Sequence, residues 1–160
     1  MTRAAAPHIV VVDRSPAIAG VYHGRFAIEG YRVTSVSDAE PDPFWVLGLG
    51  PDLVLLDLRW GGGPGGLAFL RRLRREPAGR TVPVVCATPV AELDLGRHGE
   101  ELAGLGVTLP AARDRLAGPG HLDGLVAAVD AALRWAREEP RQPGAEALGP
   151  RTAREERATA

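Results

Sequence analysis

Short apolar runs, each followed closely by turn-forming residues, restrict the folds that this chain can adopt. The strongest covers residues 52–57 (DLVLLD), and residues 8–12 (HIVVV) form a second run rich in β-branched side chains. Residues 31–36 alternate between apolar and polar, and shorter apolar runs cover residues 82–87 and 106–109. Continuous apolar runs of this length are typical of strands buried on both faces, as in a parallel sheet.

Helical segments separate these predicted strands. Ser15 followed by Pro16 is typical of a helix N-terminus, and this helix is predicted to end near Ile28. Its predicted buried face consists of Ile18, Val21, Tyr22 and Phe26. Further helices are predicted within residues 41–50, after the glycine-rich run 61–66, at 91–103 and at 121–136. The arginines at positions 71, 72, 74 and 75 are expected to form a solvated face of the helix that follows the glycine-rich run.

Strands that alternate with helices at this spacing predict an α/β fold with a five-stranded, doubly wound parallel sheet. We expect this domain to cover residues 7–136. Residues 137–160 carry five arginines, five glutamates and three prolines, with Leu148 as the only large aliphatic residue. Such a segment buries too little apolar surface to offset its ordering entropy, so a disordered charged tail is predicted and no output domain is expected.

The composition excludes several classes of protein. The formal net charge is -1, which gives no electrostatic reason to expect direct binding to nucleic acid or to an anionic membrane. No stretch approaches the roughly 18 apolar residues of a membrane span, and a cytoplasmic protein is expected. Cys86 is the single cysteine, so neither a disulfide framework nor a multi-cysteine zinc site can form, and a buried hydrophobic role is predicted for it. All 19 basic residues are arginine.

Polar residues follow three of the predicted strands at their carboxyl ends. Asp13 ends the first strand, Asp57 the third, and Thr88 follows the fourth. Ligands of open parallel sheets bind outside the carboxyl ends of the strands, so these side chains are candidates for one functional site.

These stretches resemble the receiver domain of two-component response regulators. The resemblance rests on residues 9–13 (IVVVD), 29–33 (EGYRV), 51–59 (PDLVLLDLR) and 82–88 (VPVVCAT), and with the element order it covers residues 7–136. It implies a flavodoxin-like, receiver-type fold in which Asp57 is the acceptor of a phosphoryl group from a histidine kinase. It also implies Asp13 and Asp57 as magnesium ligands, and Thr88 as a hydrogen-bond partner of the phosphoryl group.

The chain departs from the family pattern at several of these positions. Arg14 occupies the position of a second acid, and no lysine exists to fill the family's position near Pro110 or Ala111. A guanidinium beside the carboxylates removes a potential ligand and repels a cation, which argues against tight magnesium binding. Arg14 is predicted to pair with Asp13 or Asp57 instead, and Arg113 is a second candidate for the missing positive charge. Thr108 occupies the position of the family's switch aromatic, and Trp60 with the glycine-rich run is a candidate wall of the pocket.

Three hypotheses for the function follow. In the first, the chain is a stand-alone atypical receiver, not an enzyme, that acts by contacts with a histidine kinase or another regulator, with weak or no phosphorylation of Asp57. In the second, it is a working phosphorelay receiver in which Arg14 or Arg113 supplies the missing charge. In the third, the altered pocket senses a small molecule. Homodimerisation stays open in all three.

Overall fold

The fold is described from a computed structural model, which describes residues 5–59, 65–110 and 119–138. The strands are β1 (His8–Val12), β2 (Arg32–Val36), β3 (Leu53–Leu56), β4 (Val84–Cys86) and β5 (Val107–Thr108). The α-helices are α1 (Pro16–Ile28), α2 (Pro43–Gly48), α3 (Gly65–Arg75), α4 (Leu95–Gly104) and α5 (Pro119–Glu138). Two short 3₁₀ helices, η2 (Ala78–Arg80) and η3 (Val90–Glu92), flank β4.

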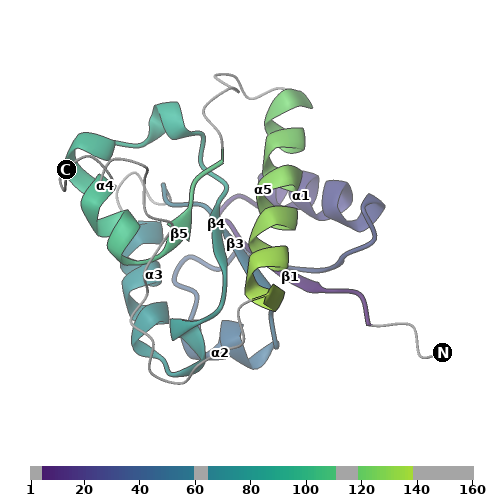
Figure 1. Cartoon of the computed structure of the whole chain (residues 1–160), viewed down its shortest axis with the longest axis horizontal. Coiled ribbons are helices and arrows are strands. Elements are labelled where there is room, and N and C mark those ends of the chain that lie inside the picture. Colours follow the sequence, from purple (N-terminus) through teal and green to yellow (C-terminus); the bar gives the residue numbers. More distant parts are fainter. Residues whose placement is uncertain (1–4, 60–64, 111–118, 139–160) are drawn as a thin grey trace, which may run out of the picture.

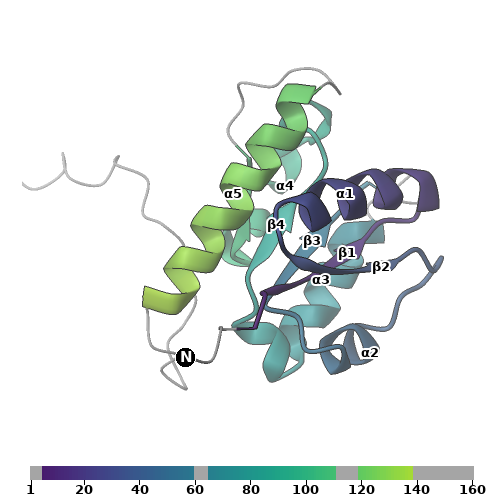
Figure 2. The ribbon, with the colours of Figure 1, turned by 90° about the vertical axis from the view of Figure 1, so that its right-hand side faces the viewer.

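Within the described residues the strands form one sheet in the order β2-β1-β3-β4-β5, with every pair parallel. This order is the doubly wound, flavodoxin-like arrangement, so the predicted fold class is confirmed. Helices α1 and α5 cover one face of the sheet, while α2, α3 and α4 lie on the other (Figure 1 and Figure 2). No helix in the described segments is long and apolar enough to cross a lipid bilayer.

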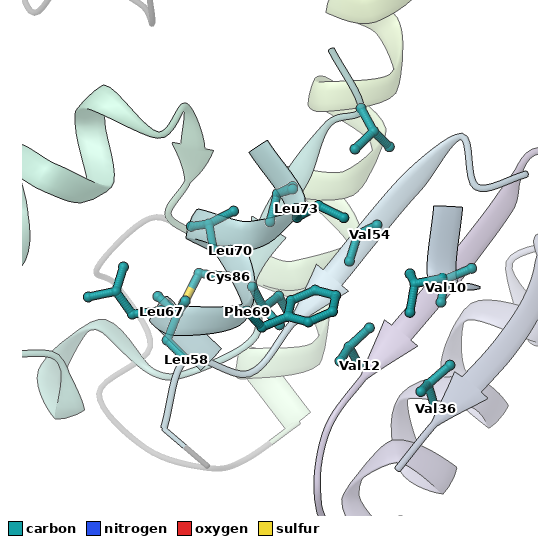
Figure 3. Packing of buried hydrophobic residues seen from close by; sticks show 14 of the residues in the cluster. Val10, Val12, Val36, Val54, Leu58, Leu67, Phe69, Leu70, Leu73 and Cys86 are labelled. Carbon is teal, nitrogen blue, oxygen red and sulfur yellow. The ribbon is translucent and has the colours of Figure 1, made fainter. Parts of the chain in front are cut away.

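The apolar strands divide their side chains between two cores. Val10 and Val12 of β1 point towards α3, whereas Ile9 and Val11 point towards α1 and α5, as the two-residue period of a strand requires. Figure 3 shows the first core, in which the apolar side of α3 packs against the central strands. Its labelled residues from α3 are Leu67, Phe69, Leu70 and Leu73. Because every residue of β1 and β3 is buried, these runs read as continuous apolar segments in the sequence.

The predicted buried face of α1 is partly wrong. Tyr22 and Phe26 are buried as predicted, but Ile18 and Val21 are 47% and 55% exposed, and Ala19 takes the inward position. Since α1 carries apolar side chains around most of its circumference, its sequence pattern does not distinguish the face that meets the sheet.

Several predicted element boundaries also differ from the structure. The expected helix at 91–103 is divided into η3 and α4, because the Asp94 side chain accepts the Arg97 N–H and begins a new helix there. The final strand is shorter than predicted and contains only Val107 and Thr108. Helix α5 extends two residues beyond the predicted helix at each end. Residues 139–160 of the predicted tail lie outside the described residues.

The expected solvated arginine face is wrong for Arg74. Its guanidinium is partly buried and donates hydrogen bonds to four backbone carbonyls. These acceptors belong to Gly79, Val82, Leu105 and Gly106. Burial lowers the pKa of Arg74 to about 10, so the side chain is still charged at neutral pH. Arg74 therefore ties the end of α3 to the segments that lead into β4 and β5.

Candidate functional site

The three polar residues that follow the strands lie on neighbouring strands of the sheet. Strands β1, β3 and β4 are adjacent, so Asp13, Asp57 and Thr88 meet at the same edge. The structure brings Asp57 and Thr88 into direct contact, because Thr88 Oγ1 donates a hydrogen bond of 2.6 Å to Asp57 Oδ1. Thr88 is only 3% exposed, and its hydroxyl oxygen accepts the Leu58 N–H at 2.8 Å. The hydroxyl thus has a fixed donor and a fixed acceptor.

The carboxylate of Asp57 is oriented through one of its two oxygens. Oδ1 accepts the Arg59 N–H at 3.0 Å in addition to the Thr88 hydroxyl. Within the described residues, Oδ2 has no hydrogen-bond partner. One oxygen therefore holds the side chain in place, while the other keeps its lone pairs available for attack on an electrophile or for a cation.

Asp13 is the more deeply buried carboxylate of the site, with 4% of its surface exposed. Burial raises its pKa above the usual range, and the charge of Asp57 adds to that effect. The Ser15 N–H, which donates to Asp13 Oδ1 at 2.8 Å, lowers the pKa and offsets part of the increase. The two carboxylates are therefore close enough to repel each other, and no ion pair with a described residue relieves this repulsion.

Arg14 does not form the ion pair predicted for it. Its side chain is exposed, and within the described part of the chain its guanidinium lies within 4.0 Å of no carboxylate. The chain bends at Arg14, and the Asp13 carboxylate accepts the Ser15 N–H at 2.8 Å instead of a guanidinium N–H. The predicted pairing with Asp13 or Asp57 is thus corrected: Arg14 is an exposed cation at the rim, with no ion-pair partner among the described residues.

Asp13 and Asp57 are the carboxylates that the sequence predicts as magnesium ligands, and both lie at this edge. Among the described residues, no group of three His, Cys, Asp or Glu side chains could hold a metal ion. Magnesium is commonly held by one or two carboxylates while waters complete its octahedral shell, so Asp13 and Asp57 could hold it in that way. The positive charge of Arg14, which directly follows Asp13, opposes a cation at this position.

The segment before Thr88 is anchored by residues that the sequence did not single out for this site. Tyr22 Oη donates to the Ala87 carbonyl at 3.4 Å, and His121 Nε2 hydrogen-bonds to the same oxygen at 3.2 Å. The Cys86 thiol donates to the Thr88 carbonyl, and burial raises the pKa of this thiol to about 12. Cys86 is fully buried, as predicted. Helices α1 and α5 are thus both tied to the end of β4.

Two further residues lie at the Asp57 loop. Gly66, in the first turn of α3, packs so closely that a Cβ there would lie 2.1 Å from the Asp57 carbonyl oxygen. Arg59 pairs with Glu92 of η3 and so links the loops that follow β3 and β4. Neither contact has a local sequence signal, because the partners are brought together only by the fold.

Several predicted site residues cannot be placed. Trp60, residues 61–64 of the glycine-rich run, and Arg113 lie outside the described residues. Thr108 is exposed on β5, and Pro110 is buried just beyond that strand.

The chain is similar to known proteins in part of its sequence and in its fold. No family model matches the chain. Over 130 residues it is 29% identical to the DNA-binding dual master transcriptional regulator RpaA of Synechocystis, a match that covers 80% of this chain and 49% of that protein. The chain therefore spans about half the length of this curated relative.

Solved structures show the same fold. Chemotaxis protein CheY4 of Vibrio cholerae aligns with a TM-score of 0.63 and 17% identity, over 80% of this chain and 99% of that one. The receiver domain of a putative LuxO repressor protein from Vibrio parahaemolyticus aligns with a TM-score of 0.62 and 19% identity, over 84% and 95%. The N-terminal domain of a response regulator receiver protein from Methanoculleus marisnigri is 27% identical, with a TM-score of 0.50, over 78% and 94%.

The strand order defines a flavodoxin-like α/β domain, and the polar residues at its carboxyl edge define where its site lies. Among flavodoxin-like domains, the structural neighbours identify the CheY-like fold of response regulator receiver domains as the fold of this chain. The sequence match to RpaA covers 80% of this chain and adds a second similarity to these structural neighbours.

Proposed function

We propose that this receiver domain acts by protein–protein contacts, and that Asp57 is phosphorylated weakly or not at all in the wild-type chain. The observation that carries the proposal is the charge balance of the site. Asp57 and Thr88 keep a geometry suited to phosphoryl acceptance, yet neither Asp57 nor Asp13 has a cationic partner among the described residues.

Charge neutralisation is the main contribution that a protein makes to phosphoryl transfer. The phosphorylated Asp57 side chain would carry about −1.5 to −2 charges at neutral pH, in place of the single negative charge of its carboxylate, and it would lie beside the buried carboxylate of Asp13. The chain contains no lysine, and Arg14 lies at the rim without a carboxylate partner in the described part of the chain. Both the transfer and its product are therefore poorly stabilised by the wild-type site.

The partner in this proposal is a histidine kinase or another regulator, as is usual for receiver domains. No activity on a separate substrate is included, and homodimerisation remains part of the same hypothesis. RpaA is a DNA-binding regulator, but this chain matches only about half of its length, and DNA binding is not part of this proposal.

The mass of the intact protein after incubation with acetyl phosphate and magnesium tests the proposal. We expect at most a minor fraction with one added phosphoryl group, and none in an Asp57→Asn control. An active receiver treated in parallel shows that the reagent works. Rapid and nearly complete modification of Asp57 would overturn the proposal.

One observation favours the second candidate, a working phosphorelay receiver. Asp57 Oδ2 has no hydrogen-bond partner among the described residues, while Oδ1 holds the carboxylate in place. This leaves a nucleophilic oxygen ready for attack at phosphorus. The same mass measurement separates the two candidates, because only the second predicts nearly complete modification.

A further inference from the structure

The ion pair between Arg59 and Glu92 brings a cation to the edge that holds Asp57 and Thr88. Arg59 follows β3, and its backbone N–H donates to Asp57 Oδ1 at 3.0 Å. Its guanidinium pairs with the carboxylate of Glu92, which belongs to the loop that follows Thr88. The pair thus connects the two loops from which Asp57 and Thr88 project.

We infer that Arg59 is the cation that binds a phosphoryl group on Asp57, and that Glu92 competes for it in the unmodified protein. This inference deepens the proposed function and rests on it, because it names the residue that binds the phosphoryl group and adds competition by Glu92 as one contribution to weak phosphorylation. Arg59 is assigned a direct phosphoryl contact. Glu92 is assigned a positioning role, because it acts only through Arg59.

The position of Arg59 relative to Asp57 favours it over the other arginines. Its backbone is hydrogen-bonded to the acceptor carboxylate, so the start of its side chain is fixed beside the reacting group. Arg14 also lies near the site, but it is exposed and pairs with no described carboxylate. It therefore has no contact that would direct its guanidinium towards Asp57, and its variant is the comparison that distinguishes the two arginines.

The exchange of partners follows from charge and shape. The side chains of Arg59 and Glu92 are 54% and 49% exposed, so their ion pair is screened by water and weak. A phosphoryl group carries more charge than one carboxylate and offers three acceptor oxygens, which a guanidinium can bind in bidentate fashion. Arg59 is therefore expected to leave Glu92 once the group is present.

The covalent step has a simple balance. Asp57 Oδ2 attacks the phosphorus of an acyl phosphate, a new O–P bond forms, and the P–O bond to the donor breaks. The donor leaves as its carboxylate, and no proton or electron is transferred. Oδ1 keeps its hydrogen bonds from Arg59 N–H and Thr88 Oγ1, which hold the attacking group in place during the reaction.

The test compares the rate of adduct formation on intact protein, with acetyl phosphate and magnesium, in the wild type and four variants. Glu92→Gln frees Arg59 and is expected to accelerate the reaction by up to about fivefold. Arg59→Gln is expected to slow it about tenfold or more, since a charged hydrogen-bond donor is lost. The double variant should match Arg59→Gln, and Arg14→Gln should not slow the reaction, because its guanidinium has no contact that directs it to Asp57.

Each outcome decides the inference. Equal rates for Glu92→Gln and the double variant overturn it even if the wild type gives no adduct, and so does a loss in Arg14→Gln as large as in Arg59→Gln. A second readout is hydrogen exchange at residues 90–94, which should increase on phosphorylation only when both Arg59 and Glu92 are present. Rapid modification of the wild type would overturn the proposed function but not this inference, which depends on the differences between variants.

Discussion

At the carboxyl edge of the sheet, Asp13 and Asp57 lie near each other, and no described cation pairs with either of them. At the amino edge, the Arg74 guanidinium lies among backbone carbonyls and pairs with no described carboxylate. Both edges therefore hold ionised side chains by hydrogen bonds to the backbone. Burial favours the neutral form of both side chains. It therefore raises the pKa of Asp13 and lowers the pKa of Arg74 to about 10.

The two edges differ in how many hydrogen-bonding atoms of the charged side chains have partners. Arg74 donates hydrogen bonds to four carbonyls from separate segments, so this cation joins those segments. Asp57 keeps Oδ2 without a described partner, so this carboxylate can still react. A charged group whose polar atoms all have hydrogen-bond partners stabilises the fold, whereas one with a free polar atom can bind or react with another group. Removal of the first should therefore cost more stability than removal of the second.

The largest effect is expected for Arg74→Met. This change keeps much of the apolar stem but leaves four carbonyls without their donor, and it should lower the free energy of unfolding by about 3 kcal/mol. Urea denaturation measures the loss. Arg75→Met, at an exposed neighbouring position, is the control and should change stability by less than about 0.5 kcal/mol. Equal effects of the two variants would contradict the assigned role of Arg74.

The next largest effect is expected at Gly66, which packs closely against the loop that begins at Asp57. Gly66→Ala places a methyl group 2.1 Å from the Asp57 carbonyl oxygen, so the loop or α3 must move, at a cost of about 2 kcal/mol. Gly24→Ala is the matched control, because it lies within α1 with open space around it and should stabilise the protein by about 0.5 to 1 kcal/mol. Thermal unfolding of both variants tests the contrast, and a stabilising Gly66→Ala would refute the close approach.

The hydroxyl of Thr88 is expected to contribute less. Thr88→Val keeps the shape but removes the donor to Asp57 and the acceptor for the Leu58 N–H, which should cost about 1 to 2 kcal/mol. Thr88→Ser retains both hydrogen bonds and should recover part of that loss. Urea denaturation of the two variants separates the hydroxyl from the methyl group. A Thr88→Val variant as stable as wild type would show that these hydrogen bonds add nothing to stability.

The smallest effect, with the opposite sign, is expected for Asp13→Asn. The folded-state pKa of Asp13 lies above 3.8, the ordinary value of an aspartate side chain, so the folded protein binds this proton more tightly than the unfolded chain does. Ionisation of Asp13 therefore lowers stability as the pH rises above 3.8. The Asn side chain can still accept the Ser15 N–H, so the variant should be more stable at pH 7 by about 1 kcal/mol or less.

The pH dependence of that difference is the check. Thermal unfolding should show an advantage of Asp13→Asn at neutral pH that shrinks as the pH falls towards 3.8, where the wild-type group becomes protonated in both states. A variant that is less stable than wild type at neutral pH would show that the carboxyl edge carries no electrostatic strain, and the contrast with Arg74 would fail.

The amino-acid sequence by itself determined the elements and the edge at which the site lies. Strands such as Leu53–Leu56 are continuous apolar runs, and Ser15 with Pro16 begins α1, so each can be recognised from a few adjacent residues. Parallel strands place their carboxyl ends together, which is why Asp57 and Thr88 could be expected at one edge before their contact was seen.

Only the tertiary structure decided which face of α1 is buried and which charged groups meet. Ile18 and Val21 fit a buried face as well as Ala19 does, and packing against the sheet made the choice. Arg59 meets Glu92 across 33 positions, and Arg74 meets Leu105 across 31. Local sequence patterns show whether a residue is apolar and where helices and strands begin. The partner of a charged side chain depends on how distant segments pack, because that packing alone sets the distance between the two side chains.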